Sequence, residues 1–281
     1  MIAIVGGLGA AVMWATSTLS TSRSTKLVSP VSVLASVMTI GVVITAPFAL
    51  GGGVPDALGG KELAWLATSG LANLVGLLLA YSSLRVGKVG VVAPITSAQG
   101  AAAAIIAMLA GERIAAGSGV MLAVIAVGVA LASLSRAAEG TREHDGRGAM
   151  LAGASAMLFG LGLYASGRLA GDLPVAWILF VPRLLGTLVF AAPMMLLGRV
   201  HMTGRALRFV LVSGVCEVVG LAMFTLGARE GIAVTAVISS QFAALAALVA
   251  YFAFGERLRR IQIAGVAAIL VGVAVLTGLQ G

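Results

Sequence analysis

Long apolar stretches, separated by short polar ones, follow one another along the whole chain. Each runs for about 18 to 24 residues, enough to cross about 30 Å of hydrocarbon, and none alternates as membrane β-strands do. Backbone groups in lipid need partners within their own segment, so the pattern predicts membrane-spanning α-helices. Ten spans are expected, near residues 3–21, 29–50, 63–84, 89–109, 117–134, 149–167, 174–197, 208–228, 233–253 and 261–279.

The pattern repeats at an offset of 144 residues, which places Gly111-Glu112-Arg113 on Gly255-Glu256-Arg257. Each copy holds five spans, and an odd number makes the second copy enter the membrane from the opposite side. We therefore expect an all-α integral membrane fold of two antiparallel, inverted five-helix repeats, residues 1–140 and 141–281. Repeats of this kind enclose a central cavity in secondary transporters.

Composition and charge support a membrane protein. The chain is 60% hydrophobic and 10% charged, with a mean hydropathy of +1.10, which excludes an ordinary soluble domain. In a soluble protein, a net charge of +8 would indicate binding to nucleic acid. Here the basic residues lie in short loops, where lipid headgroups are the expected partner. One side of the membrane collects only Lys61, Arg113, Arg168 and Arg229. The positive-inside rule places the other, more basic side in the cytoplasm, and both termini outside the plasma (inner) membrane.

Recurring residues at the helix ends carry a family resemblance. The Gly-Glu-Arg turns at 111–113 and 255–257 each follow an alanine-rich span and precede a Val-Gly-Val-Ala stretch. Arg85-Val86-Gly87 and Arg229-Glu230-Gly231 link the third and fourth spans of each copy, and Pro94 lies in a fourth span. In these features the chain resembles EamA-type transporters of the drug/metabolite transporter (DMT) superfamily. The resemblance implies ten helices, a cavity lined by the first four helices of each half, peripheral fifth and tenth helices, and cytoplasmic termini, the reverse of the charge count.

Two charged residues lie deep within spans. Glu217, about ten residues into the eighth span, is expected to couple protons or anchor a cation, with a structural carboxylate as the alternative. Arg183 lies at similar depth in the seventh span and needs an anionic partner. The two predict either a permanent ion pair or a pair that opens for a zwitterionic or anionic substrate. Neither has a charged equivalent in the other repeat, where Thr39 and Asn73 stand, so the charged site is expected to be one-sided.

Polar and aromatic residues within other spans complete the candidate site. The further substrate-binding candidates are Asn73, Gln99, Gln241, Trp14, Thr96 and Ser239. Amides at this depth either hydrogen-bond between helices or contact substrate. Thr96 with Gln99, and Thr235 with Ser239, share helix faces that we expect to look into the cavity. Trp14 is expected either to line the pocket or to pack against neighbouring helices.

Other conspicuous residues have structural interpretations. Tyr81 and Tyr164 lie near the ends of predicted spans and are expected at the membrane interface. The glycines of the Gly-Glu-Arg turns are typical of helix C-caps, with the adjacent Glu and Arg free to pair.

Enzyme signatures are absent from the sequence: it has no HExxH, P-loop or CxxC motif, no G-x-S-x-G with a histidine within the membrane, and one cysteine, Cys216. We therefore expect no enzyme, no catalytic residue, no metal and no cofactor. The expected function is secondary transport, by alternating access, of small polar or amphipathic metabolites such as amino acids or organic anions, with export as the direction and protons as a candidate coupling ion. The protein is expected to be a monomer or homodimer. A flippase for lipids or lipid-linked sugars, multidrug efflux and a non-transporting scaffold are the alternatives.

Overall fold

The computed structural model describes residues 1–87, 89–112, 120, 123, 127, 142–246 and 249. Most of the fifth predicted span, the whole of the tenth, Arg113 and the second Gly-Glu-Arg turn lie outside this part.

Every regular element in the described ranges is a helix. Six helical segments there are long and apolar enough to cross a membrane. Four are the uninterrupted helices α1 (Ile2–Leu27), α2 (Pro30–Gly51), α3 (Gly60–Val86) and α10 (Gly204–Ala228). The fifth belongs to α7 (Arg142–Leu169), and the sixth joins α8 (Val175–Gly186), the π-helical turn η1 (Thr187–Ala191) and α9 (Ala192–Leu196). Shorter apolar helices are α4 (Val89–Thr96), α5 (Gln99–Leu109) and α11 (Ile232–Ser239).

Local sequence signals set several helix ends. The Ser29 side chain accepts a hydrogen bond from Ser32 N at the start of α2, and Pro30 occupies the first turn, where its missing N–H costs nothing. Thr203 caps α10 in the same way. Gly111, the glycine of the first Gly-Glu-Arg turn, has φ of +98° just beyond α5, as the C-cap interpretation expects.

The fourth and ninth spans, expected as continuous helices, are interrupted near their middles. A turn at Ser97 and Ala98 separates α4 from α5, and a turn at Ser240 and Gln241 ends α11 before the helix resumes at Phe242. The repeat offset places Ser97 on Gln241, so the two interruptions overlap. The Ser240 hydroxyl donates to Val237 O at 2.6 Å, a local bond that competes with the helical ladder.

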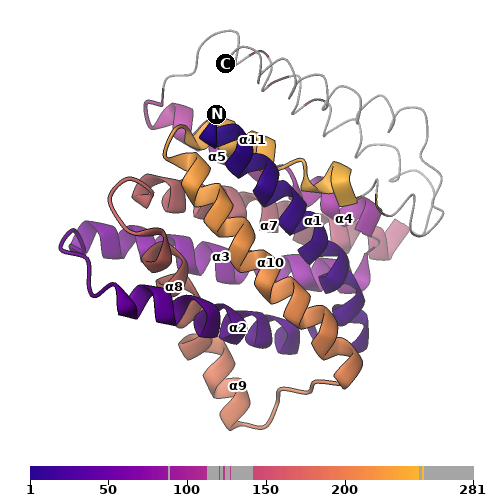
Figure 1. Cartoon of the computed structure of the whole chain (residues 1–281). Helices are drawn as coiled ribbons and strands as arrows, with labels where there is room; N and C mark the ends of the chain where they lie inside the picture. Colours follow the sequence, from indigo (N-terminus) through magenta and orange to yellow (C-terminus); the bar gives the residue numbers. More distant parts are fainter. Residues whose placement is uncertain are drawn as a thin grey trace.

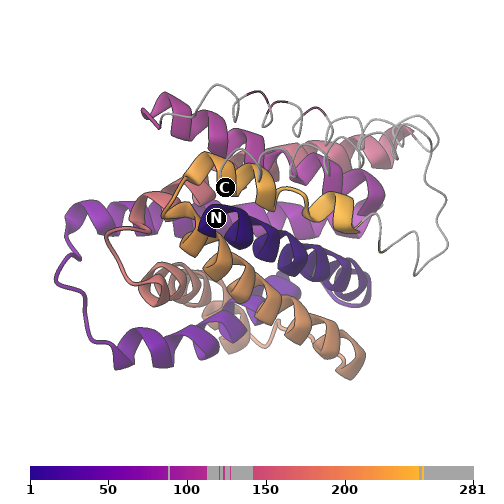
Figure 2. The same cartoon turned by 45° about the horizontal axis from the view of Figure 1, so that its top comes forward.

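Helices from the two repeats pair across the bundle. Helices α1 and α10 lie side by side along their lengths, and α3 pairs with α7 in the same way (Figures 1 and 2). Helix α5 contacts α7 and α11, while α2 contacts α8 and α10. Small residues permit the close approach: a Cβ at Gly6 would lie 2.8 Å from the Cα of Gly227. The repeats are therefore interleaved rather than separate.

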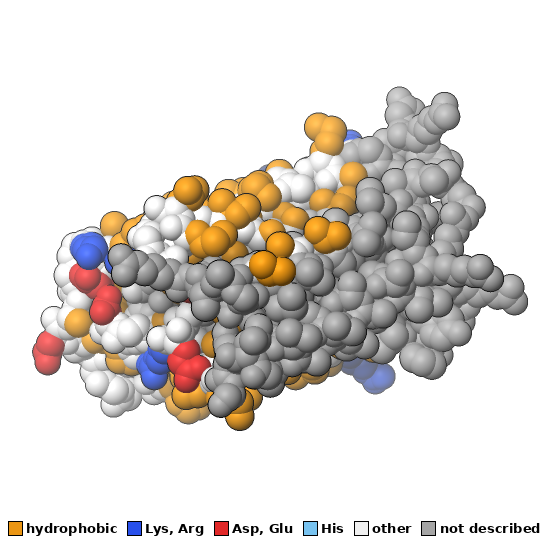
Figure 3. Space-filling view, turned by 90° about the horizontal axis from the view of Figure 1, so that it is seen from above, with side chains coloured by type: hydrophobic (Ala, Val, Ile, Leu, Met, Phe, Trp, Pro, Cys, Tyr) orange, Lys and Arg blue, Asp and Glu red, His pale blue; other side chains and the backbone are white. Residues whose placement is uncertain are grey.

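The outer surface of the bundle is apolar. Large hydrophobic side chains with more than half of their area exposed include Val5, Val43, Phe48, Leu188 and Leu196. In Figure 3 hydrophobic side chains cover much of the part of the visible face that is not grey, whereas the acidic side chains in view gather at its left end together with some of the basic ones. This distribution suits a bundle whose sides contact lipid and whose end contacts water.

Candidate functional site

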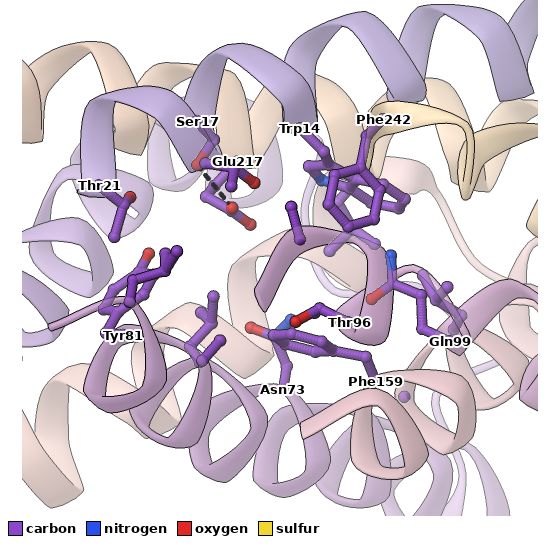
Figure 4. Close-up of a pocket in the computed structure, with 18 of the residues that line it drawn as sticks. Trp14, Ser17, Thr21, Asn73, Tyr81, Thr96, Gln99, Phe159, Glu217 and Phe242 are labelled. Carbon is purple, nitrogen blue, oxygen red and sulfur yellow. Dashed lines mark hydrogen bonds between the residues drawn. The ribbon is translucent and has the colours of Figure 1, made fainter. Parts of the chain in front are cut away.

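A cavity lies between the helices of both halves (Figure 4). Helices α1, α3, α4, α5, α7, α8 and α10 contribute its walls, together with Phe242 beyond the second interruption. The polar lining residues are Ser17, Thr18, Thr21, Ser69, Asn73, Tyr81, Thr96, Gln99, Ser166, Arg183 and Glu217. Its remaining walls are apolar or aromatic, so the cavity offers a few polar groups on a hydrophobic background.

Arg183 supplies the positive charge of the cavity and is only 1% exposed. It follows Pro182 on α8 and passes Gly41 of α2, where a Cβ would lie 2.7 Å from its Cδ. Its Nη1 donates a 2.6 Å hydrogen bond to Asn73 Oδ1 on α3. Its Nη2 lies 4.0 Å from Glu217 Oε2, and neither Nη2 nor Nε has a hydrogen-bond partner. The guanidinium is therefore buried with most of its donors unused.

Glu217 faces Arg183 from α10 and keeps a side-chain exposure of 13%. Its Oε1 accepts a 2.8 Å hydrogen bond from the Ser17 hydroxyl. Ser17 and Ser213 hydroxyls lie 2.9 Å apart, and Ser213 lies 2.8 Å from the Thr21 hydroxyl. One carboxylate oxygen is thus held by a hydroxyl chain, while the other is directed at the guanidinium.

The repeat offset relates the groups on either side of Arg183. Asn73 and Glu217 are equivalent positions, and so are Ser69 and Ser213. Ser69 bonds across to Ser166 of α7 at 2.7 Å, as Ser213 bonds across to α1. Hydroxyl pairs therefore occur in both halves, whereas the acidic group lies in the second half alone and the cation reaches from that half to Asn73.

Aromatic side chains form the apolar walls. Trp14 lines the cavity and packs against Phe224, and the centroids of the two rings are 6.1 Å apart. Phe159 lies against Gly76, where a Cβ would approach its ring to 2.9 Å. Figure 4 shows Trp14 beside Phe242 at one side of the cavity and Tyr81 at the other. These rings leave room for an apolar ligand body next to the charged pair.

The cavity brings together six of the eight residues that the sequence analysis proposed for the site, namely Glu217, Arg183, Asn73, Gln99, Trp14 and Thr96. Ser239 and Gln241 are buried outside the lining: the Ser239 hydroxyl donates to Ala236 O, and Gln241 Nε2 donates to Val237 O. The face of α11 that carries Thr235 packs against Gly7 and Gly227 instead. The ninth span contributes Phe242 because its helix is interrupted just before that residue.

Both tyrosines that were expected at the membrane interface are buried within the bundle. Tyr81 is buried in the cavity wall, since α3 continues to Val86 and leaves this position inside the bundle. Tyr164 is also buried and meets Trp65 edge-on, with ring centroids 5.8 Å apart.

The sequence analysis passed over the cavity hydroxyls, although spacing offered a signal. Ser17 and Thr21 are four residues apart, as are Ser69 and Asn73, so each pair shares a helix face.

One end of the bundle, here called the clasped end, is closed by bonds between the halves. Glu112 of the first Gly-Glu-Arg turn accepts a 3.1 Å hydrogen bond from Ala233 N at the start of α11. Glu230, beyond α10, accepts one of 3.1 Å from Ala3 N at the start of α1. Each carboxylate thus caps a helix N-terminus of the other half, where negative charge is favourable.

Comparison with known proteins agrees with this architecture. A crystal structure of a protein matches with a TM-score of 0.76 and 22% identity, over 99% of this chain and 96% of that one, which establishes the fold alone. No curated protein matches the chain. The profile of the EamA-like transporter family matches residues 1–134 and again residues 146–278. The chain therefore belongs to the EamA-like transporter family of the DMT superfamily and is a multi-pass membrane transporter.

Proposed function

We propose that the protein is a secondary transporter that exports small polar or amphipathic metabolites, such as organic anions or amino acids, by alternating access. The observation that carries this proposal is the buried Arg183, which lies between Asn73 and Glu217 in a cavity shared by both halves. A permanently charged group in the membrane interior marks a substrate or ion pathway when it faces a cavity.

The proposed architecture is ten helices in two inverted repeats, residues 1–140 and 141–281. The antiparallel pairing of α3 with α7 supports it. Gly76 of α3 lies against Phe159 of α7, while Gly87, just beyond α3, lies near Gly148 of α7, so the two helices run in opposite directions. Because α1 and α3 are separated by one span, α7 then runs opposite to its repeat equivalent α1. The overlapping interruptions of the fourth and ninth spans fit the discontinuous helices that line midplane sites in such transporters.

The proposed orientation follows the basic loops. Arg199, Arg205 and Arg208 lie near the start of α10, at the end of the bundle opposite the clasped end. With those loops in the cytoplasm, the clasped end faces outside. A cysteine at position 205 in a Cys216→Ser background should then react with a membrane-permeant maleimide only, whereas labelling by an impermeant reagent in intact cells reverses the orientation.

A liposome transport screen tests the function. Purified protein is reconstituted and assayed for uptake and counterflow of organic anions, amino acids, sugars and cationic drugs, with and without a pH gradient. We expect solute movement that is lost in Arg183→Met and kept in Val43→Ala, a control whose side chain is 68% exposed on the apolar surface. Movement of no class of solute by a folded protein contradicts the proposal.

A lipid flippase is the second candidate, because an apolar crevice opens between α2, α8 and α10. Ile44, Phe48, Leu179, Val218 and Met223 are among its lining residues. Scrambling of fluorescent phospholipid in the same liposomes, sensitive to Phe48→Ser, would favour this function over solute transport.

A further inference from the structure

We propose that Arg183 receives the carboxylate of the substrate, and that Glu217 takes up one proton when this carboxylate replaces it as the partner of the guanidinium. Substrate anion and proton would then cross the membrane together. This inference rests on the proposed function and specifies its substrate class and coupling.

Among the residues that line the cavity, the fully buried side-chain atoms without a hydrogen-bond partner belong to the guanidinium of Arg183 and the hydroxyl of Tyr81. The two guanidinium atoms are Nε and Nη2. A carboxylate brings acceptors alone, as the two free guanidinium nitrogens require, whereas an ammonium group would bring three more donors beside them. The buried unsatisfied groups of Arg183 therefore match an anionic head group.

Arg183 and Glu217 form an incomplete pair that a ligand can open. Their closest atoms are 4.0 Å apart, beyond hydrogen-bond length. Asn73 holds Nη1, and Ser17 holds the far oxygen of Glu217, so both side chains keep a fixed support when the pair opens. A guanidinium presents planar N–H groups that match the two oxygens of a carboxylate.

The proton uptake follows from the charges that face Glu217. Among the described helices around it, Arg183 comes from α8 and Tyr81 from α3, while α1 contributes the hydroxyls of Ser17 and Thr21. Helices α2, α4, α5 and α11 carry no titratable side chain, and the neighbour of Glu217 on α10 is Cys216. When a substrate anion satisfies Arg183, the described cavity lining offers Glu217 no second cation. A buried carboxylate without a counter-charge is strongly disfavoured, and a proton from solvent removes its charge.

The walls beside the pair indicate the rest of the ligand. Trp14, Phe159, Leu163, Leu221 and Phe242 surround the space adjoining the charged groups. We infer a small monocarboxylate with an apolar, ring-sized body.

Three probes with the same phenyl body separate the possible head groups. Phenylacetate, phenylacetamide and phenethylammonium are titrated into the full chain in lipid nanodiscs near pH 7, by calorimetry in buffers of different ionisation enthalpy. We expect phenylacetate to bind at least about tenfold more tightly than the other two. About one proton should be taken up for each phenylacetate bound.

Two variants assign the roles. Glu217→Gln should still bind phenylacetate but take up no proton, because its amide does not titrate. The double variant Arg183→Met with Glu217→Gln removes both charges, so no buried charge is left unpaired; it should fold and lose phenylacetate binding. Val43→Ala should behave as the parent protein does.

Several results overturn the inference. These are no binding of phenylacetate, binding without proton uptake, unchanged uptake in Glu217→Gln, unchanged binding in the double variant, or equal affinity for phenethylammonium. Binding of phenylalanine in place of phenylacetate, with no proton taken up, would show that a zwitterion bridges Arg183 and Glu217; the proposed function would then stand and the coupling would fail. The proposed function itself fails only if the liposomes show no solute movement.

Discussion

The clasped end and the opposite, basic-loop end join the two halves in different ways. At the clasped end, carboxylates cap helix starts across the halves, and the helices behind them meet through glycine contacts. Ala103, Ala107 and Phe224 are buried behind that end and do not line the central cavity. At the basic-loop end, His201 N donates a 3.3 Å hydrogen bond to Ser32 Oγ and so joins the two halves. The clasped end holds a separate pocket lined by residues such as Ala107, Glu112 and Glu230, while the central cavity extends toward the other end, reaching Leu84 and Val92.

This difference shows which contacts must break if the cavity is to open at the clasped end. Alternating access exchanges a closed end for an open one around a fixed site. Single capping bonds and glycine contacts suit this exchange, because each can be broken separately at a modest free-energy cost. A continuous layer of large interlocked side chains would resist it.

Adding a methyl group at Gly100, where α5 meets α11, should have the largest effect on stability and closure. A Cβ at Gly100 would lie 2.6 Å from Ser240 Cβ and would also meet Ala236 O. Gly100→Ala should lower the free energy of unfolding by about 1–3 kcal/mol and weaken closure of the clasped end. Thermal melting measures the first effect, and maleimide reaction of Ala107→Cys, in a Cys216→Ser background, measures the second.

Gly153→Ala is the matched control, since a Cβ at Gly153 meets no atom within 4 Å. It should leave both readouts near those of the parent. Equal effects of the two changes would refute the role of the α5–α11 contact.

Removing one carboxylate cap should have a smaller effect. Glu112→Ala deletes the acceptor of Ala233 N and should cost about 1 kcal/mol, the usual value for a lost helix cap. Glu112→Gln keeps an acceptor oxygen and should cost less. The labelling rate of Ala107→Cys should be lowest with Glu112 intact, higher with Glu112→Gln and highest with Glu112→Ala. Equal rates in all three proteins would show that this cap does not hold the end closed.

The indole of Trp177 offers a third test of the joins between halves. Its Nε1 donates to Ala49 O at 3.1 Å and Gly53 O at 2.9 Å, at the end of α2. Trp177→Phe keeps an aromatic ring but loses the donor, so stability should fall by about 0.5–1.5 kcal/mol. Melting of Trp177→Phe is compared with that of Trp65→Phe, which retains the ring contact with Tyr164. If Trp177→Phe lowers stability no more than Trp65→Phe does, the indole hydrogen bonds do not contribute to joining the halves.

Acid should loosen the clasped end slightly. The backbone N–H of Ala3 holds the pKa of Glu230 below its ordinary value. The bond is therefore fully present above that ordinary value and is lost as the pH falls through the lowered one. Reaction of Ala107→Cys, with an acid-tolerant thiol reagent, should quicken over this range in the parent and not in Glu230→Gln. A parent rate without pH dependence would contradict the assignment.

The sequence predicted the described spans well because length and hydropathy alone decide where a helix fits a bilayer. It also predicted that Arg183 and Glu217 lie at a similar level in neighbouring helices, since adjacent spans joined by a short loop run antiparallel, and the two side chains do face each other. It missed the interruptions at Ser97 and Ser240, because a hydroxyl or a small residue leaves an apolar run looking continuous. It placed Tyr81 at the interface and Ser239 in the cavity because helix rotation depends on neighbours, and a glycine such as Gly227 draws one face of α11 inward.

The position of Arg183 bears on how the membrane voltage acts on this carrier. Its contacts, Asn73 and Glu217, are equivalent positions at the 144-residue offset, so in the proposed inverted-repeat architecture the cation lies close to the axis that relates the halves. Rocking about such an axis moves a central charge only a small distance through the electric field. Since the work is about 2.3 kcal/mol for a full crossing at 100 mV, such a small displacement costs little. The return of the empty carrier should therefore depend weakly on voltage.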